Sequence, residues 1–171
     1  MAEMGLDTFK ANLTSPARGY IWEVMIPVPI GGGDSTAVTL RARSTQIPGR
    51  SFETIDIPYK QTAGIVVNGR MKYDHTWNCT FLENEDGKIF KMIRAWQQLI
   101  IDDRTGIGLG ENGTRTVAYL KCLKQDGSSW LNIKLKDVWI SDQKPVELAQ
   151  DQGTSLITFN VTFVYNSWEP A

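Results

Sequence analysis

Alternation of apolar and polar residues is the pattern that most constrains how this chain can fold. Its clearest run places Ile157, Phe159, Val161, Phe163 and Tyr165 on one side and mostly uncharged polar residues on the other. Because side chains alternate between the two faces of a β-strand, this run predicts a strand with one buried face. The same period predicts strands over residues 20–28, 36–43, 52–57, 64–67, 75–82, 115–123 and 130–140.

Residues 85–101 depart from this period and predict one helix. Ile89, Ile93, Trp96 and Ile100 recur at spacings of four, three and four, which places them on one side of an amphipathic helix. Asn84 is the predicted N-cap. We therefore predict a mainly β fold, an antiparallel β-sandwich or barrel with one packed α-helix. The length of 171 residues fits one domain.

The residue types that an active site requires do not form a constellation here. His75 is the single histidine, and no serine, cysteine or carboxylate pairs with it by spacing. The sequence from Gly108 to Gly113 matches the letters of a dinucleotide-binding loop, but it follows a helix and precedes a strand, which reverses the required order. Cys79 and Cys122 lie in apolar runs without metal-ligand spacing. We predict no catalytic site, no cofactor and no metal.

Charge argues against a protein that holds nucleic acid through a general basic surface. The formal net charge is -1. Residues 41–72 nevertheless carry six bases and two acids, whereas the chain from Asp142 onward carries one base and four acids. Such asymmetry is either chance or a sign that opposite ends meet between copies. No apolar run is long enough to span a bilayer, and the first residues do not resemble a secretory signal.

The segment 44–74 is unusually apolar for a connection between strands. Glycine and proline interrupt it, as in Pro48-Gly49 and at Gly64. Its apolar members include Ile47, Phe52, Ile55, Ile57, Tyr59, Ile65 and Val67. An exposed apolar hairpin aggregates unless something covers it. Either it packs on its own domain or it docks on another subunit, and composition does not decide between the two.

Several motifs, in order, resemble the tail tube proteins of contractile-tailed bacteriophages. Residues 68–81 are similar to the family core Tyr-x-x-x-Trp-x-x-Thr-Phe, and residues 42–49 to its entry into a long hairpin, with Ile47 in place of leucine. Residues 18–24 resemble the first strand of the family, and residues 159–169 its closing strand. The motif residues that we carry over from the family are Tyr73, Trp77, Phe81, Trp96 and Trp168.

The resemblance implies a tail tube domain over 1–171, with a fold shared with the inner tubes of type VI secretion systems and R-type pyocins. It implies an N-terminal arm over 1–17 and an inter-ring hairpin over 44–74. Hexameric rings would stack into a virion tail tube, assembled in the host bacterial cytoplasm without membrane insertion. The implied inter-ring residues are Ile47, Pro48, Phe52, Ile55, Ile57, Tyr59, Ile65 and Val67.

The same resemblance implies the partners of the tube. A sheath protein would wrap the outside, while tape measure protein and double-stranded DNA would occupy the lumen without sequence-specific binding. Baseplate and tail terminator proteins would close the two ends. A lumen wall that passes DNA without holding it should be neutral or acidic. Two alternatives share the fold: a baseplate tube initiator and a secreted inner-tube protein of a type VI secretion system.

Overall fold

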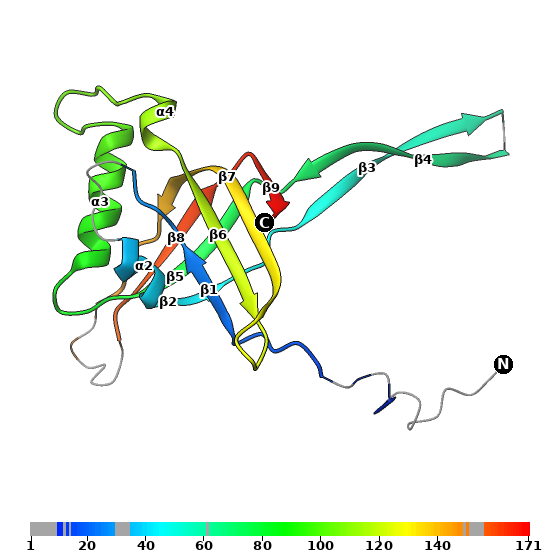
Figure 1. Ribbon diagram of the computed structural model, residues 1–171. Coiled ribbons are helices and arrows are strands. Elements are labelled where there is room, and N and C mark those ends of the chain that lie inside the picture. Colours follow the sequence, from blue (N-terminus) through cyan, green and yellow to red (C-terminus); the bar gives the residue numbers. More distant parts are fainter. Residues whose placement is uncertain are drawn as a thin grey trace.

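The computed structural model describes residues 10, 11, 13, 15–29, 35–60, 62–148, 150 and 156–171. It consists of a β-body with one long helix and a two-stranded hairpin that projects from it (Figure 1). The helices are α2 (Ser35–Arg41), α3 (Lys88–Ile100) and α4 (Glu111–Thr114). The strands are β1 (Trp22–Met25), β2 (Ala42–Thr45), β3 (Arg50–Tyr59), β4 (Thr62–Tyr73), β5 (Thr76–Leu82), β6 (Thr116–Leu123), β7 (Ser129–Gln143), β8 (Thr158–Val164) and β9 (Ser167–Pro170).

The body has two layers that share strand β7. The first layer contains β1, β6, the first half of β7 and β9; the second contains β2, β5, β8 and the second half of β7. All of these pairs are antiparallel, as the sequence predicted. The strand changes partner at Asp137, which adopts a positive φ of 56°. Aspartate tolerates this left-handed conformation better than most residues do, so the sequence permits a bend there.

The core lies between the two layers and beneath α3. Trp77, Phe81 and Trp96 are fully buried and surround Phe163, with ring centroids 5.6, 6.4 and 6.0 Å from its own. The indole Nε1 of Trp96 donates a hydrogen bond to the Thr114 carbonyl at 2.8 Å. Three of the predicted motif residues are therefore core residues that hold the layers together.

Helix α3 is the predicted helix, but it begins later and is capped differently. It buries Ile89, Met92, Ile93 and Trp96. Gly87, not Asn84, occupies the N-cap and supplies no side-chain bond. The free backbone N–H groups of the first turn are instead satisfied by the Glu83 carboxylate, which accepts from Ile89 at 3.3 Å and Phe90 at 2.7 Å. The Asn84 prediction was wrong because a longer carboxylate side chain reaches this turn from one residue earlier.

Arg41 links this helix start to the end of α2. Its guanidinium forms ion pairs with Glu83 at 3.3 Å and with Asp86 at 3.0 Å. The hydrogen bond from Arg41 lowers the pKa of Asp86 to about 2. The Glu83 side chain is only 7% exposed and also accepts from the Asn84 N–H. Glu83 therefore joins the end of α2 to the start of α3.

We expect Glu83→Gln to destabilise the body by about 1–3 kcal/mol, because the amide loses the charge of a nearly buried hydrogen-bond acceptor. Glu85→Gln is the matched control, since Glu85 is exposed in the same turn. Urea unfolding followed by circular dichroism measures both variants. Equal midpoints for the two would contradict the role of Glu83.

Two predicted strands are interrupted in the structure, and the predicted strand over 20–28 is shorter, since β1 spans Trp22–Met25. The segment 36–43 was expected to be one strand, but it forms most of α2 and the start of β2. Val38 is 1% exposed and Leu40 is 79% exposed, although a strand would place both on one face. The predicted closing strand is split: β8 ends at Val164, and the chain then crosses to the first layer as β9. Residues 31–34, between the predicted strands over 20–28 and 36–43, lie outside the described residues, as do residues 1–9, 12 and 14 of the implied N-terminal arm.

Candidate functional site

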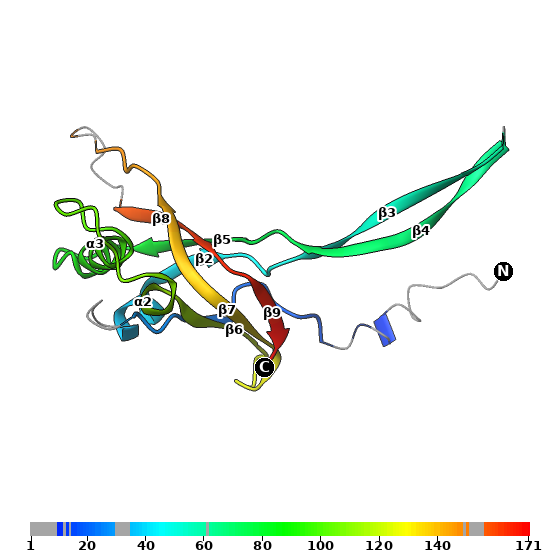
Figure 2. The same ribbon diagram turned by 90° about the horizontal axis from the view of Figure 1, so that it is seen from above.

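The projecting hairpin contacts the described part of its own subunit at its root and is otherwise uncovered by it (Figure 1). Among the strands of the described residues, β3 and β4 pair only with each other. They extend away from the body in both views of Figure 1 and Figure 2. Of the two possibilities left open by the sequence, packing of this segment on its own domain is seen, among the described residues, only at the root of the hairpin. The strands are also longer than the predicted 52–57 and 64–67.

On one face of the hairpin, apolar residues of β3 lie opposite apolar residues of β4. Ile55 lies opposite Val67, and Ile57 lies opposite Ile65. Their exposed fractions are 51% for Ile55, 37% for Val67, 45% for Ile57 and 64% for Ile65. Residues on the other face include Thr54 opposite Asn68 and Asp56 opposite Val66. Two adjacent exposed aliphatic pairs form a ridge that a second protein could cover, which we name the hairpin ridge.

The other predicted interface residues are distributed along the hairpin. Phe52 and Tyr59 are 61% and 63% exposed, and both lie on β3. Ile47 and Pro48 precede β3 and lie at its root, where Pro48 is buried. Lys72 and Glu53 form an ion pair across the two strands. Only part of the predicted interface therefore projects into solvent, and Pro48 supports the root.

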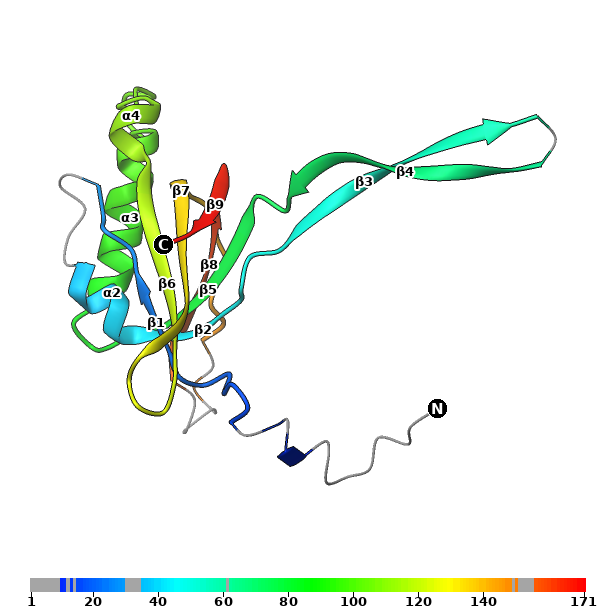
Figure 3. The same ribbon diagram turned by 45° about the vertical axis from the view of Figure 1, so that its right-hand side comes forward.

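Two tryptophans of the body fix the root of the hairpin. The Trp77 Nε1 donates to the Gln46 carbonyl at 3.0 Å, and the Trp168 Nε1 donates to the Gly49 carbonyl at 3.3 Å. The guanidinium of Arg50 lies 5.1 Å from the centre of the Trp168 ring, and Tyr73 makes an edge contact with the same ring. Trp168 thus contacts the first residue of β3 and the last of β4. Figure 3 shows the hairpin projecting from the body. Alternation and spacing predicted none of these contacts.

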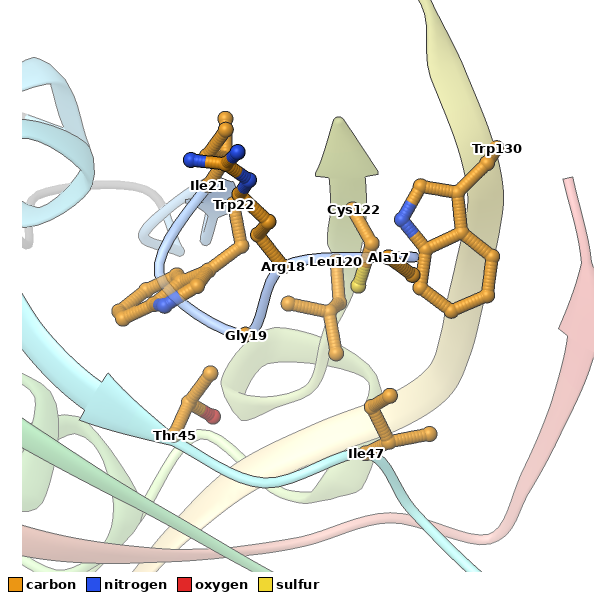
Figure 4. A pocket seen from close by; sticks show the side chains of 10 residues that line it. All are labelled: Ala17, Arg18, Gly19, Ile21, Trp22, Thr45, Ile47, Leu120, Cys122 and Trp130. Carbon is orange, nitrogen blue, oxygen red and sulfur yellow. The ribbon is translucent and has the colours of Figure 1, made fainter. Parts of the chain in front are cut away.

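A cavity of about 270 Å³ lies beside the two edge strands β1 and β2 (Figure 4). Ile21 and Trp22 line it from the β1 side, and Thr45 and Ile47 from the β2 side. Leu120, Cys122 and Trp130 complete its apolar wall, while Arg18 and Gly19 lie at the segment before β1. Burial raises the pKa of the Cys122 thiol, so this sulfur is not an activated nucleophile.

The residues that were considered for catalysis have structural surroundings. The His75 Nδ1 lies 2.9 Å from the Tyr165 carbonyl, and its ring is beside those of Tyr73 and Tyr165. Burial raises the pKa of the Cys79 thiol to about 12. Within the described ranges, no group of three or more His, Cys, Asp or Glu side chains could hold a metal ion.

The glycine-rich loop is explained by packing. A Cβ at Gly108 would lie 1.9 Å from the Ile100 carbonyl oxygen, so the loop can close on α3 only with glycine there. The Leu109 N–H donates to the Leu99 carbonyl at 3.1 Å, which ties the loop to the helix end. One helical turn, α4, then leads into β6.

None of the helices formed by the described residues is both long and apolar enough to cross a bilayer.

The fold is that of tubes found in contractile injection machines. The sheath–tube complex of the extracellular contractile injection system PVC, in its extended state, contains a chain with a TM-score of 0.62 and 11% identity, with 98% of this chain and 99% of that chain covered. A chain of the six-fold symmetrised baseplate of the anti-feeding prophage gives 0.66 at 7% identity, with 92% and 96% covered.

A chain of the PVC sheath/tube terminator in its extended state also gives a TM-score of 0.66, at 10% identity, with 93% and 99% covered. At these identities the similarity establishes the fold alone. A search of curated protein sequences found no significant match.

The family model described as phage tail tube protein matches residues 8–170. The chain belongs to the phage tail tube protein family. It is a structural protein and not an enzyme, as the lack of a catalytic constellation in the sequence predicted.

Proposed function

We propose that this chain forms the inner tube of a contractile tail as hexameric rings that stack end to end. The observation that carries the proposal is the hairpin ridge, whose aliphatic pairs are exposed on a two-stranded ribbon. An isolated hairpin is marginally stable in water, so a partner that buries it gains apolar contact and also stabilises the ribbon. The same ridge on every copy makes a repeating, head-to-tail contact possible.

The hairpin ridge is the main contact between successive rings in this proposal. The rings enclose a lumen through which phage DNA passes during ejection, and the tape measure protein occupies that lumen before it. A sheath surrounds the tube, and baseplate and terminator proteins close its ends. Chains of similar fold from a sheath–tube complex, a baseplate and a sheath/tube terminator support these partners.

Opposite charges at the two ends of the sequence contribute less to this proposal than the ridge does. Arg41 already pairs with Glu83 and Asp86, and Lys72 pairs with Glu53. In the acidic part of the chain, Glu169 pairs with Lys136 at 2.7 Å. Two of the six bases and one of the four acids are therefore already paired inside one subunit, and the proposal rests on apolar burial instead.

Electron microscopy of the purified protein tests the proposal. We expect rings and tubes in negative stain, in greater number when baseplate is present as a nucleus. A protein that stays monomeric at high concentration, with and without baseplate, would refute the tube. A baseplate tube initiator would instead be present in one or a few rings per particle, which quantitative mass spectrometry of purified tails distinguishes from many rings.

A further inference from the structure

The outer face of the second layer has an unusual composition for a protein surface. Along β5, Trp77, Cys79 and Phe81 are buried while Thr76 and Asn78 are exposed. Along β8, Phe159, Val161 and Phe163 are buried while Asn160 is exposed. Neither strand contains an aspartate, glutamate, lysine or arginine. The side chains that β5 and β8 turn away from the core are Thr76, Asn78, Thr80, Leu82, Thr158, Asn160, Thr162 and Val164, which we name the Asn/Thr face.

The polar side chains at the centre of this face are paired with one another across the strands. The Thr80 hydroxyl donates to the Asn160 side-chain oxygen at 2.6 Å, and the Thr162 hydroxyl donates to that of Asn78 at 2.8 Å. These residues lie opposite each other in the β5–β8 register. Cross-strand hydrogen bonds of this kind hold both side chains against the sheet. The face is therefore neutral and its amides are held in place.

The first layer presents the opposite chemistry. Its outward residues in register include Glu23 opposite Lys121, and Lys134 opposite Glu169. Lys136 pairs with Glu169 on the same face. Charges are thus abundant on one sheet and missing from the two central strands of the other. Arg43 and Asp142 lie beside the bulges of the flanking strands β2 and β7, one charge of each sign.

The Asn/Thr face is also free of its own subunit's helix. Helix α3 covers the other side of the same layer, where Trp96 contacts Phe163 and Phe90 contacts Phe159, with ring centroids 6.0 and 5.8 Å apart. The exposed side of α3, which carries Gln98, therefore lies on the opposite side of the layer from the Asn/Thr face.

The hairpin extends the same layer. Strand β2 pairs with β5 in the body, and the two continue through short connections into β3 and β4, which pair in the hairpin. A hairpin that reaches the next ring would carry these two strands along the tube axis. The Asn/Thr face would then belong to a wall that continues from one ring to the next.

We infer that the Asn/Thr face lines the lumen and is the surface that meets the DNA duplex. This inference rests on the proposed tube. Each lysine or arginine facing a duplex contributes to binding by releasing counterions, so a wall without cations lets DNA slide. The hydroxyls of Thr80 and Thr162 already donate to amide oxygens on this face, so they are not free donors for phosphate oxygens. The charged face of the first layer, with its lysines, would hold the duplex instead.

Placement of a label tests the inference directly. Asn160→Cys carries a gold–maleimide label, and Gln98→Cys on the exposed side of α3 is the matched control. Unaltered protein, treated with the same label, measures the background from the native cysteines Cys79 and Cys122, both of which are buried. In electron micrographs of tubes we expect gold on the tube axis for Asn160→Cys and away from it for Gln98→Cys. Gold outside the lumen for Asn160→Cys would overturn the inference.

The outcome is separable from that of the proposed function. If the unaltered protein forms no tubes, the tube proposal fails, and the lumen inference fails with it. If the unaltered protein and Gln98→Cys form tubes but Asn160→Cys does not, Asn78→Cys and Thr162→Cys are examined next. Loss of assembly in all three would assign the face to contacts between subunits and overturn the lumen.

Introduced charge gives a second readout. At low salt, tubes of the double variant Asn78→Lys, Asn160→Lys should retain at least about tenfold more of a short fluorescent DNA duplex than unaltered tubes do. They should release it as the salt concentration rises. Tubes of Gln98→Lys, whose added charge lies on the helix, should retain it no better than unaltered tubes do. Equal retention by the double variant and unaltered tubes would contradict a lumen position.

Discussion

Replacing Ile57 with aspartate is expected to stop tube formation while leaving the subunit folded. Ile57 lies on the hairpin ridge, opposite Ile65, and is 45% exposed in the single subunit. Burial of Ile55 and Ile57 against a neighbouring ring would each contribute about 1.5–3 kcal/mol. A buried aspartate without a partner reverses that gain, because the carboxylate loses its water. The contact is repeated around every ring, so the loss multiplies along the tube.

Two variants serve as controls for this result. Thr54→Asp places the same charge on the other face of the same strand, and Ile57→Val keeps an aliphatic side chain on the ridge. We expect both to assemble. Their melting temperatures should lie within about 1 °C of that of unaltered protein, which corresponds to a few tenths of a kcal/mol in the free energy of unfolding. The Ile57→Asp protein should keep its strand content by circular dichroism and stop at monomers or single rings. Full-length tubes at normal yield from Ile57→Asp would show that the ridge is not the contact.

The periodic parts of the fold could be predicted from the sequence because one face of each strand is buried. Alternation gave β8 and β5 nearly to the residue, and the four-three-four spacing gave the buried side of α3. The hairpin strands were predicted too short, because Ile65, Val66 and Val67 form a continuous apolar run with exposed side chains on both faces. A strand segment that is exposed on both faces has no buried face to impose alternation.

Features that depend on distant partners could not be predicted. The helix start relies on Glu83 together with Arg41, which is 42 residues earlier in the chain. The root of the hairpin relies on Trp168, which donates to Gly49 across 119 residues. Residues 36–43 show the alternation of a strand, yet Val38 lies in helix α2, where it is buried. In each case a tertiary contact overrides a local pattern, and spacing contains no information about that contact.

The predicted site combined residues with two different physical roles. Trp77, Phe81 and Trp96 are core residues, whereas Ile55, Ile57, Ile65 and Val67 are exposed on the ridge. Both sets are apolar, so composition does not separate them. Mutations distinguish them clearly: a change in the core lowers the free energy of unfolding, and a change on the ridge lowers assembly alone.

Trp77→Ala is therefore the counterpart of Ile57→Asp and should have the largest effect on stability. Trp77 is fully buried against Phe163. Its removal leaves a cavity between the layers, which costs about 3–5 kcal/mol. For a chain of this size the melting temperature should fall by roughly 6–20 °C. Assembly would be lost where the body unfolds, and the missing bond to Gln46 at the root of the hairpin would weaken it further.

Two further variants separate packing from hydrogen bonding at this position. Trp77→Phe keeps an aromatic ring in the core but leaves the Gln46 carbonyl without the donor that it has at 3.0 Å, so we expect a smaller loss of about 1–3 kcal/mol. Trp130→Ala removes a tryptophan that is 44% exposed and should cost less than either change at Trp77. Thermal unfolding of the three variants measures their melting temperatures, which should be lowest for Trp77→Ala and highest for Trp130→Ala. If Trp130→Ala were as damaging as Trp77→Ala, the core between the layers would not be what holds this body together.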